Sequence, residues 1–149
     1  MLGALFRSHP WGAAGTWAIK IDEPNHPLVR SFDGQGFYIQ DEIFQMRDSP
    51  YSREKLRVLL SLDMAKGVNK NVEGAIRADQ DVAVSWIRTY EQGRVFFGSL
   101  GHNKDIFWQP RILEHYLAGI QFALGDLDVD SRPSATLRPA PQAALAPDR

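Results

Sequence analysis

Residues 56–62, with the sequence Leu-Arg-Val-Leu-Leu-Ser-Leu, form a nearly continuous apolar run. A run of this length is typical of a strand that is buried on both faces. The chain has enough apolar material to surround such a strand, because 44% of its 149 residues are hydrophobic and 11% are aromatic. We therefore expect one globular domain of ordinary size.

Other segments of the sequence also predict strands. Residues 17–22 alternate between apolar and polar side chains, and residues 36–44 are rich in aromatic and branched ones. Residues 82–90 and 94–100 are separated by a short connection that ends in Gly93, a spacing typical of a β-hairpin. We expect the second strand of this hairpin to be buried.

The clearest helix covers residues 108–124. Pro110 suits its first turn, and Gly125 suits its end. Its large apolar residues recur at helical spacing and predict one apolar stripe along the helix. The stripe consists of Ile112, Leu113, Tyr116, Leu117, Ile120 and Leu124.

The two ends of the chain differ from the middle. Residues 1–6 resemble the last turns of a helix, so we expect the chain to begin inside a larger fold. Residues 126–149 are rich in Pro and Ala and poor in large apolar groups, which predicts a disordered tail. No run reaches the roughly 18 apolar residues of a membrane span, and the first six residues are too short for a signal peptide. As the chain stands we expect a cytoplasmic protein, or a periplasmic or secreted one if a leader precedes it.

Charge and composition exclude several classes of function. The formal net charge is −1, from 17 basic and 18 acidic residues without a basic cluster, so we expect neither nucleic acid nor a membrane as a partner. The absence of cysteine excludes disulfides, thiolate metal sites and a cysteine nucleophile. No phosphate-binding loop, nucleophile elbow or dinucleotide fingerprint is present. His, Asp, Glu and Ser must therefore carry any chemistry.

The first candidate site is the loop Gly101-His102-Asn103, which follows the strand predicted at 94–100. This layout places a polar side chain at the edge of a sheet, where α/β folds keep their sites. Imidazole suits acid/base chemistry or metal ligation near neutral pH. The alternative is that His102 only hydrogen-bonds to loop backbone.

Asp41 and Glu42 form the second candidate. Strand alternation puts Asp41 on the same face as Ile39 and Ile43, where an unpaired carboxylate would be costly. Asp41 therefore needs a partner, and either a catalytic role or a structural hydrogen bond would supply one. Glu42 has the opposite parity and reaches a cleft if the strand ends there.

His9 is the third candidate, because it lies in a Gly-containing connection of a type that often carries binding groups. The alternative is a solvated loop histidine. We expect His26 and His115 to be structural, the latter on the less apolar face of the helix. Among the tryptophans, we expect Trp86 in the core, and Trp11 and Trp108 at the surface, where a sugar ring could stack on them.

Taken in order, several short motifs resemble the ThuA-like trehalose utilisation family. They are Leu2-Gly3-Ala4 with Phe6 and His9-Pro10, then His26-Pro27, Asp41-Glu42-Ile43-Phe44, Val84-Ser85-Trp86 with Tyr90, Gly93-Arg94-Val95-Phe96-Phe97, Leu100-Gly101-His102, and the helix end Gly119-Ile120-Gln121-Phe122-Ala123-Leu124-Gly125. The resemblance covers residues 1–125 and only the later part of the family's domain. It implies the C-terminal part of an α/β, flavodoxin-like sheet related to class I glutamine amidotransferases, without the N-terminal strands.

The resemblance also implies a function in bacterial sugar metabolism, with trehalose-type or 3-keto disaccharides as substrates. It gives His102 a counterpart in the amidotransferases, where a histidine follows a late strand, but this chain has no cysteine for thiol-based glutamine hydrolysis. The first hypothesis is a hydrolase or lyase in which His102, Asp41, Glu42 and His9 perform acid/base chemistry. A divalent metal held by His9, Glu42 and His102 is a variant of it.

Two further hypotheses remain open. One is a non-catalytic carbohydrate-binding or interaction module. The other is a fragment that is inactive, or that needs a second copy or another protein to cover the sheet edge left by the missing strands.

Overall fold

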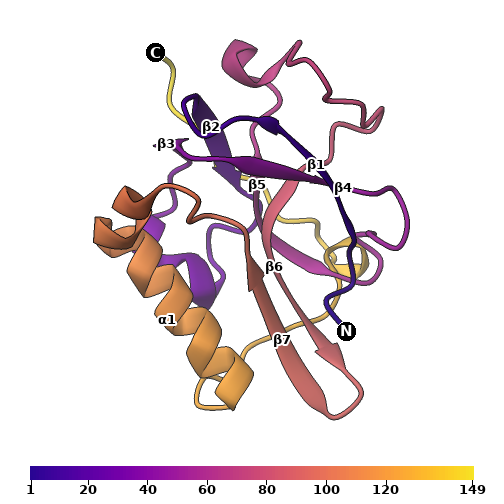
Figure 1. Ribbon diagram of the computed structural model, residues 1–149. Helices are drawn as coiled ribbons and strands as arrows, with labels where there is room; N and C mark the ends of the chain where they lie inside the picture. Colours follow the sequence, from indigo (N-terminus) through magenta and orange to yellow (C-terminus); the bar gives the residue numbers. More distant parts are fainter.

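A computed structural model describes all 149 residues and shows a chain dominated by antiparallel sheet with one α-helix (Figure 1). A five-stranded sheet has the order β3-β2-β5-β6-β7, and a two-stranded sheet pairs β1 with β4. The strands are β1 (Phe6–Trp11), β2 (Thr16–Ile21), β3 (Phe37–Gln40), β4 (Ile43–Met46), β5 (Arg57–Leu62), β6 (Ala83–Tyr90) and β7 (Gly93–Gly98). The helices are α1 (Pro110–Leu124) and the short 3-10 turns η1 (Pro27–Phe32), η2 (Gly67–Asn69), η3 (Lys104–Trp108) and η4 (Ser134–Thr136).

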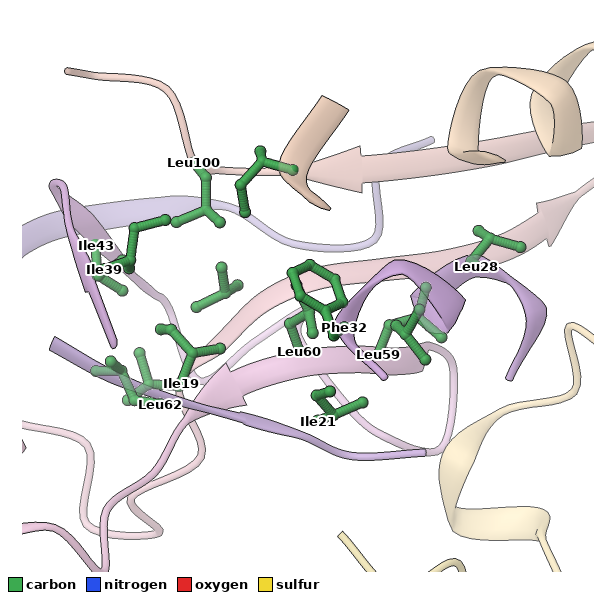
Figure 2. Packing of buried hydrophobic residues seen from close by; sticks show 14 of the residues in the cluster. Ile19, Ile21, Leu28, Phe32, Ile39, Ile43, Leu59, Leu60, Leu62 and Leu100 are labelled. Carbon is green, nitrogen blue, oxygen red and sulfur yellow. The ribbon is translucent and has the colours of Figure 1, made fainter. Parts of the chain in front are cut away.

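The apolar run that dominates the sequence forms β5, the middle strand of the larger sheet. Every residue of β5 is buried, which confirms the prediction of burial on both faces. On one side its strand neighbour is β2, with Ile21 opposite Leu60. Figure 2 shows the apolar side chains of β2 and β5 meeting those of η1 around Phe32.

The predicted hairpin is confirmed as β6 and β7, with Tyr90 paired to Gly93 across a two-residue turn. Glu91 in that turn has a φ of 54°, in the left-handed region that tight hairpin turns require. The prediction that the second strand is buried is wrong, because β7 is an edge strand and its residues are half-buried or exposed.

The predicted helix is confirmed as α1, which begins with Pro110 and ends before Gly125 in the left-handed conformation. It packs against β7 and η1 (Figure 1). Gly119 allows this approach, since a Cβ there would lie 2.4 Å from Phe96. The buried face consists of Ile112, His115, Gly119 and Phe122, so only part of the predicted apolar stripe is buried.

The strand predicted at 36–44 is two strands that belong to different sheets. β3 ends at Gln40 and pairs with β2, whereas β4 begins at Ile43 and pairs with β1. The break falls on Asp41 and Glu42. At this break Asp41 contacts the backbone of Gly101 and Asn103, and Glu42 contacts His9 and His102.

The fold class is mixed α/β, but all strand pairs are antiparallel. The structure therefore does not show the parallel, flavodoxin-like sheet that the family resemblance implies. The expectation of a helix at residues 1–6 is also wrong, because Gly3 lies in a bend and β1 begins at Phe6. α1, with 15 residues, is shorter than a membrane span, and none of the helices combines the necessary length and apolarity.

Residues 126–149, for which composition predicts disorder, have defined contacts in the structure. Ile21 and Ala144 exchange two backbone hydrogen bonds of 2.9 Å. Asp63 accepts a hydrogen bond of 3.0 Å from the backbone of Ala146, and Leu137 is buried. Two of these contacts use the backbone of Ala144 and Ala146, and backbone pairing is not visible in composition.

Candidate functional site

The buried carboxylate of Asp41 fixes the loop that carries His102. Its Oδ2 accepts a hydrogen bond of 2.6 Å from the backbone N–H of Gly101, and its Oδ1 accepts one of 2.8 Å from that of Asn103. Asp41 is fully buried, so these two N–H groups satisfy a charge that has no access to water. The sequence argument required a partner for Asp41, and the structure provides it on both sides of His102.

Asn103 holds the same loop from its other end. Its Nδ2 donates to the backbone oxygens of Ala13, at 2.8 Å, and of Gln40, at 3.0 Å. These bonds join the loop to the β1–β2 connection and to the end of β3. Asp41 and Asn103 together fix the backbone on either side of His102, while the imidazole itself remains about half exposed.

Glu42 lies between two histidines. Its Oε2 is 3.2 Å from Nδ1 of His9, and its Oε1 is 3.7 Å from Nδ1 of His102. The Glu42 side chain is only 14% exposed, whereas both imidazoles are more than half exposed. The structure thus brings together His9, Glu42 and His102, which are separated by 33 and 60 positions in the sequence.

The location of His9 differs from the prediction, because it lies within β1 rather than in a loop. Its neighbour Glu42 follows the end of β3 and precedes β4, the partner strand of β1. The pairing of β1 with β4 therefore brings His9 to the carboxylate. Phe6, on the same strand, stacks on the His9 ring with centroids 6.1 Å apart and planes at 20°.

The orientation of the two imidazoles determines what the site can do. Each ring directs Nδ1 toward Glu42, which leaves Nε2 directed away from the carboxylate. A carboxylate beside Nδ1 can fix the orientation of an imidazole ring. Two histidines that share one carboxylate can therefore serve as an acid and a base on one bound molecule.

The geometry does not form a metal site. No group of three or more His, Asp or Glu side chains is arranged to hold a metal ion. The carboxylate of Glu42 instead contacts the imidazoles of His9 and His102 directly. The metal variant predicted from the sequence stays a prediction without support from the geometry.

The other two histidines are structural, as predicted. Nδ1 of His26 accepts a hydrogen bond from Leu28 at the start of η1, and burial lowers the pKa of His26. His115 lies on the buried face of α1, not on the less apolar face as predicted, between Ser85 Oγ at 2.9 Å and the Leu28 oxygen at 2.7 Å. Burial lowers the pKa of His115 to about 4.

The tryptophans follow the prediction in part. Trp86 is buried and Trp108 is exposed, as expected. Trp11 is buried, contrary to expectation, because its Nε1 donates to the backbone oxygen of Asn69 inside the core. The aromatic side chain beside the candidate site is Phe6, whose exposure the sequence argument missed. Alternation along β1 from His9 could not place it, because the β1–β4 register shifts within that strand.

A pocket lies at a different place, near the end of β2 and beside residues 128–144. Its volume is about 670 Å³, and Glu23, His26, Arg57 and Asp130 contribute to its lining. Arg57 Nη2 is 2.6 Å from Glu23 Oε2, and Nη1 is 3.3 Å from Asp130 Oδ2. Burial raises the pKa of Glu23 against the opposing effect of Arg57. These charges pair with one another. The ion pair between Arg57 and Asp130 therefore attaches the C-terminal segment to β5.

Comparison with known proteins identifies a family for this chain. Residues 1–123 match the protein family described as trehalose utilisation, ThuA. No curated protein and no solved structure matches the chain. The match includes His9, Asp41, Glu42 and His102, and it spans well over half of the 149 residues. The chain therefore belongs to the ThuA family, which carries a role in trehalose utilisation.

Proposed function

We propose that this protein cleaves a 3-keto disaccharide of the trehalose type by acid/base catalysis at His9, Glu42 and His102. One observation carries the proposal: the carboxylate of Glu42 lies 3.2 Å from one imidazole and 3.7 Å from the other. The trehalose utilisation family supports the class of substrate.

The chemistry of a keto sugar suits two imidazoles. A carbonyl at C3 acidifies the C–H bond at C2, so one neutral imidazole removes that proton. The electron pair of this C–H bond forms a double bond between C2 and C1, and the bond from C1 to the glycosidic oxygen breaks. The second imidazole, protonated beforehand, donates its proton to the departing oxygen and thereby releases glucose. Exchange with water restores both rings, so no oxidant or reductant is needed.

Each residue has a separate part in this scheme. Glu42 lies beside Nδ1 of both imidazoles and orients them, so that the Nε2 atoms are free to face the substrate. Asp41, which the sequence argument included among catalytic candidates, is a positioning residue because both its oxygens are bound to loop backbone. Phe6 offers an exposed aromatic ring beside His9, on which a sugar ring can rest.

Glucose release from 3-ketotrehalose tests the proposal. We expect wild-type turnover to fall at least about 100-fold in His102→Ala and His9→Ala, since general acid–base groups contribute about 10² to 10⁴. Glu42→Gln should also lower turnover, because it removes the carboxylate that orients both imidazoles. Glu91→Gln, in the exposed β6–β7 turn, is the matched control and should keep full turnover. Full turnover in either histidine variant contradicts the proposal.

A second candidate function is a carbohydrate-binding module without turnover. The exposure of the site favours it, because both imidazoles are more than half exposed. Calorimetry with 3-ketotrehalose separates the two functions. Binding without glucose release supports the module. The absence of both binding and release supports an inactive fragment.

A further inference from the structure

α1 has a second apolar stripe that nothing in the structure covers. Leu113, Leu117, Ile120 and Leu124 are 43% to 73% exposed, on the side of the helix away from the buried face. Their spacing of four, three and four residues is that of a helix that pairs with another helix. A helix that is packed on one face normally shows polar residues on the other.

The size of this surface matches an interface. Trp108, immediately before α1, is 81% exposed and extends the apolar surface at the start of the helix. With residue areas of about 200 Å² for Leu and Ile and about 250 Å² for Trp, these five residues expose roughly 650 Å². The largest apolar patch of a typical monomer is about 300 to 600 Å². Two such surfaces together reach about 1,300 Å², within the range of stable interfaces.

The stripe is also complementary to itself. Its spacing is the same in both directions along the helix, so a two-fold axis midway between Leu117 and Ile120 brings Leu117 against Ile120 of a second copy. The same axis brings Leu113 against Leu124 of that copy. On one flank, Glu114 then faces Gln121 of the second copy, and a carboxylate accepts a hydrogen bond from an amide. No like charges meet across this pairing.

We propose that two copies of this chain form a dimer through antiparallel pairing of their α1 helices. This dimer covers the exposed apolar stripe of α1. It therefore differs from the partner expected from the sequence, which would cover an exposed edge of the sheet. The proposal is independent of the proposed catalytic function, because none of its residues belongs to the group around Glu42.

Sedimentation or light scattering of the purified chain over a range of concentrations tests the dimer. We expect twice the chain mass of 16.8 kDa for the wild type and the mass of one chain for Leu117→Glu and Ile120→Glu. The matched control is Ile76→Glu, an equally exposed isoleucine in the loop before β6, which should remain a dimer. Circular dichroism of each variant confirms that it is folded.

The absence of native cysteine allows a test of orientation. The double variant with Leu113→Cys and Leu124→Cys should form a disulfide-linked dimer on oxidation. Leu113→Cys alone should not, because antiparallel pairing separates the two introduced thiols by about 16 Å along the helix. A monomeric wild type at about 100 µM, or a dimer that survives Ile120→Glu, overturns the proposal. Efficient linkage by Leu113→Cys alone also overturns it, because that result indicates parallel pairing.

Discussion

The replacement Asp41→Asn tests how the loop around His102 is held. In the wild type both carboxylate oxygens accept backbone hydrogen bonds, of 2.6 Å from Gly101 and 2.8 Å from Asn103. An asparagine amide has one oxygen and one NH₂ group, so it can accept only one of these bonds. The other backbone N–H then faces a donor inside a fully buried site.

The loss of unfolding free energy in Asp41→Asn follows from these two hydrogen bonds. Loss of a hydrogen bond to a charged acceptor costs about 1.5 to 3 kcal/mol, and a buried donor without a partner adds to it. We therefore expect Asp41→Asn to lower the free energy of unfolding by about 2 to 4 kcal/mol. With a urea m-value of about 2 kcal/mol/M, in the middle of the range for small proteins, the midpoint should fall by about 1 to 2 M.

Urea unfolding followed by tryptophan fluorescence measures this loss, with Glu42→Gln as the control. Glu42 is next in sequence and has the same charge, but its carboxylate accepts no backbone hydrogen bond, so its replacement should change stability by less than about 1 kcal/mol. The reasoning is refuted if Asp41→Asn unfolds within about 0.5 kcal/mol of the wild type, which is the effect of an ordinary surface substitution.

Three further predictions concern stability. Because burial lowers the pKa of His115 to about 4 and the unfolded value is near 6.5, the unfolded chain binds more protons between these values, and stability should fall as pH is lowered from 6.5 toward 4. His115→Gln should reduce this slope in urea titrations, leaving the contribution of His26, and an unchanged slope contradicts the assignment. Arg57→Met should cost about 3 to 5 kcal/mol in thermal unfolding, because it leaves Glu23 buried without its partner, and Glu23→Gln in the same chain should recover part of the loss. Gly119→Ala should destabilise by about 1 to 3 kcal/mol although alanine favours helix, because its Cβ would meet Phe96; a more stable variant would show that α1 can shift away from β7.

Much of the fold follows from local patterns in the sequence. The apolar run of β5, the hairpin at Gly93 and the helix between Pro110 and Gly125 are determined by periodicity and turn residues, which act over a few positions. The division of residues 36–44 between two sheets was not predictable in this way. It depends on hydrogen bonds between Asp41 and a loop 60 residues later, and alternation along one strand contains no information about such a partner.

In the candidate site, too, the sequence predicts some features, whereas others depend on contacts between distant residues. The sequence could identify His9, Glu42 and His102 by residue type and by family resemblance, but their convergence depends on the pairing of β1 with β4. The separate role of Asp41 also required the structure, because adjacent carboxylates are chemically alike until their partners are known. The contacts of residues 126–149 were missed because they use backbone pairing, as between Ile21 and Ala144.

The central claim is that Glu42 joins His9 and His102 into one site, and nuclear magnetic resonance of the imidazole nitrogens tests it most directly. The chain contains only four histidines, so each can be assigned. We predict that Glu42→Gln shifts the ring nitrogen resonances of both His9 and His102 and leaves those of His26 and His115 unchanged. A change confined to one of the two rings, or to neither, would contradict the claim.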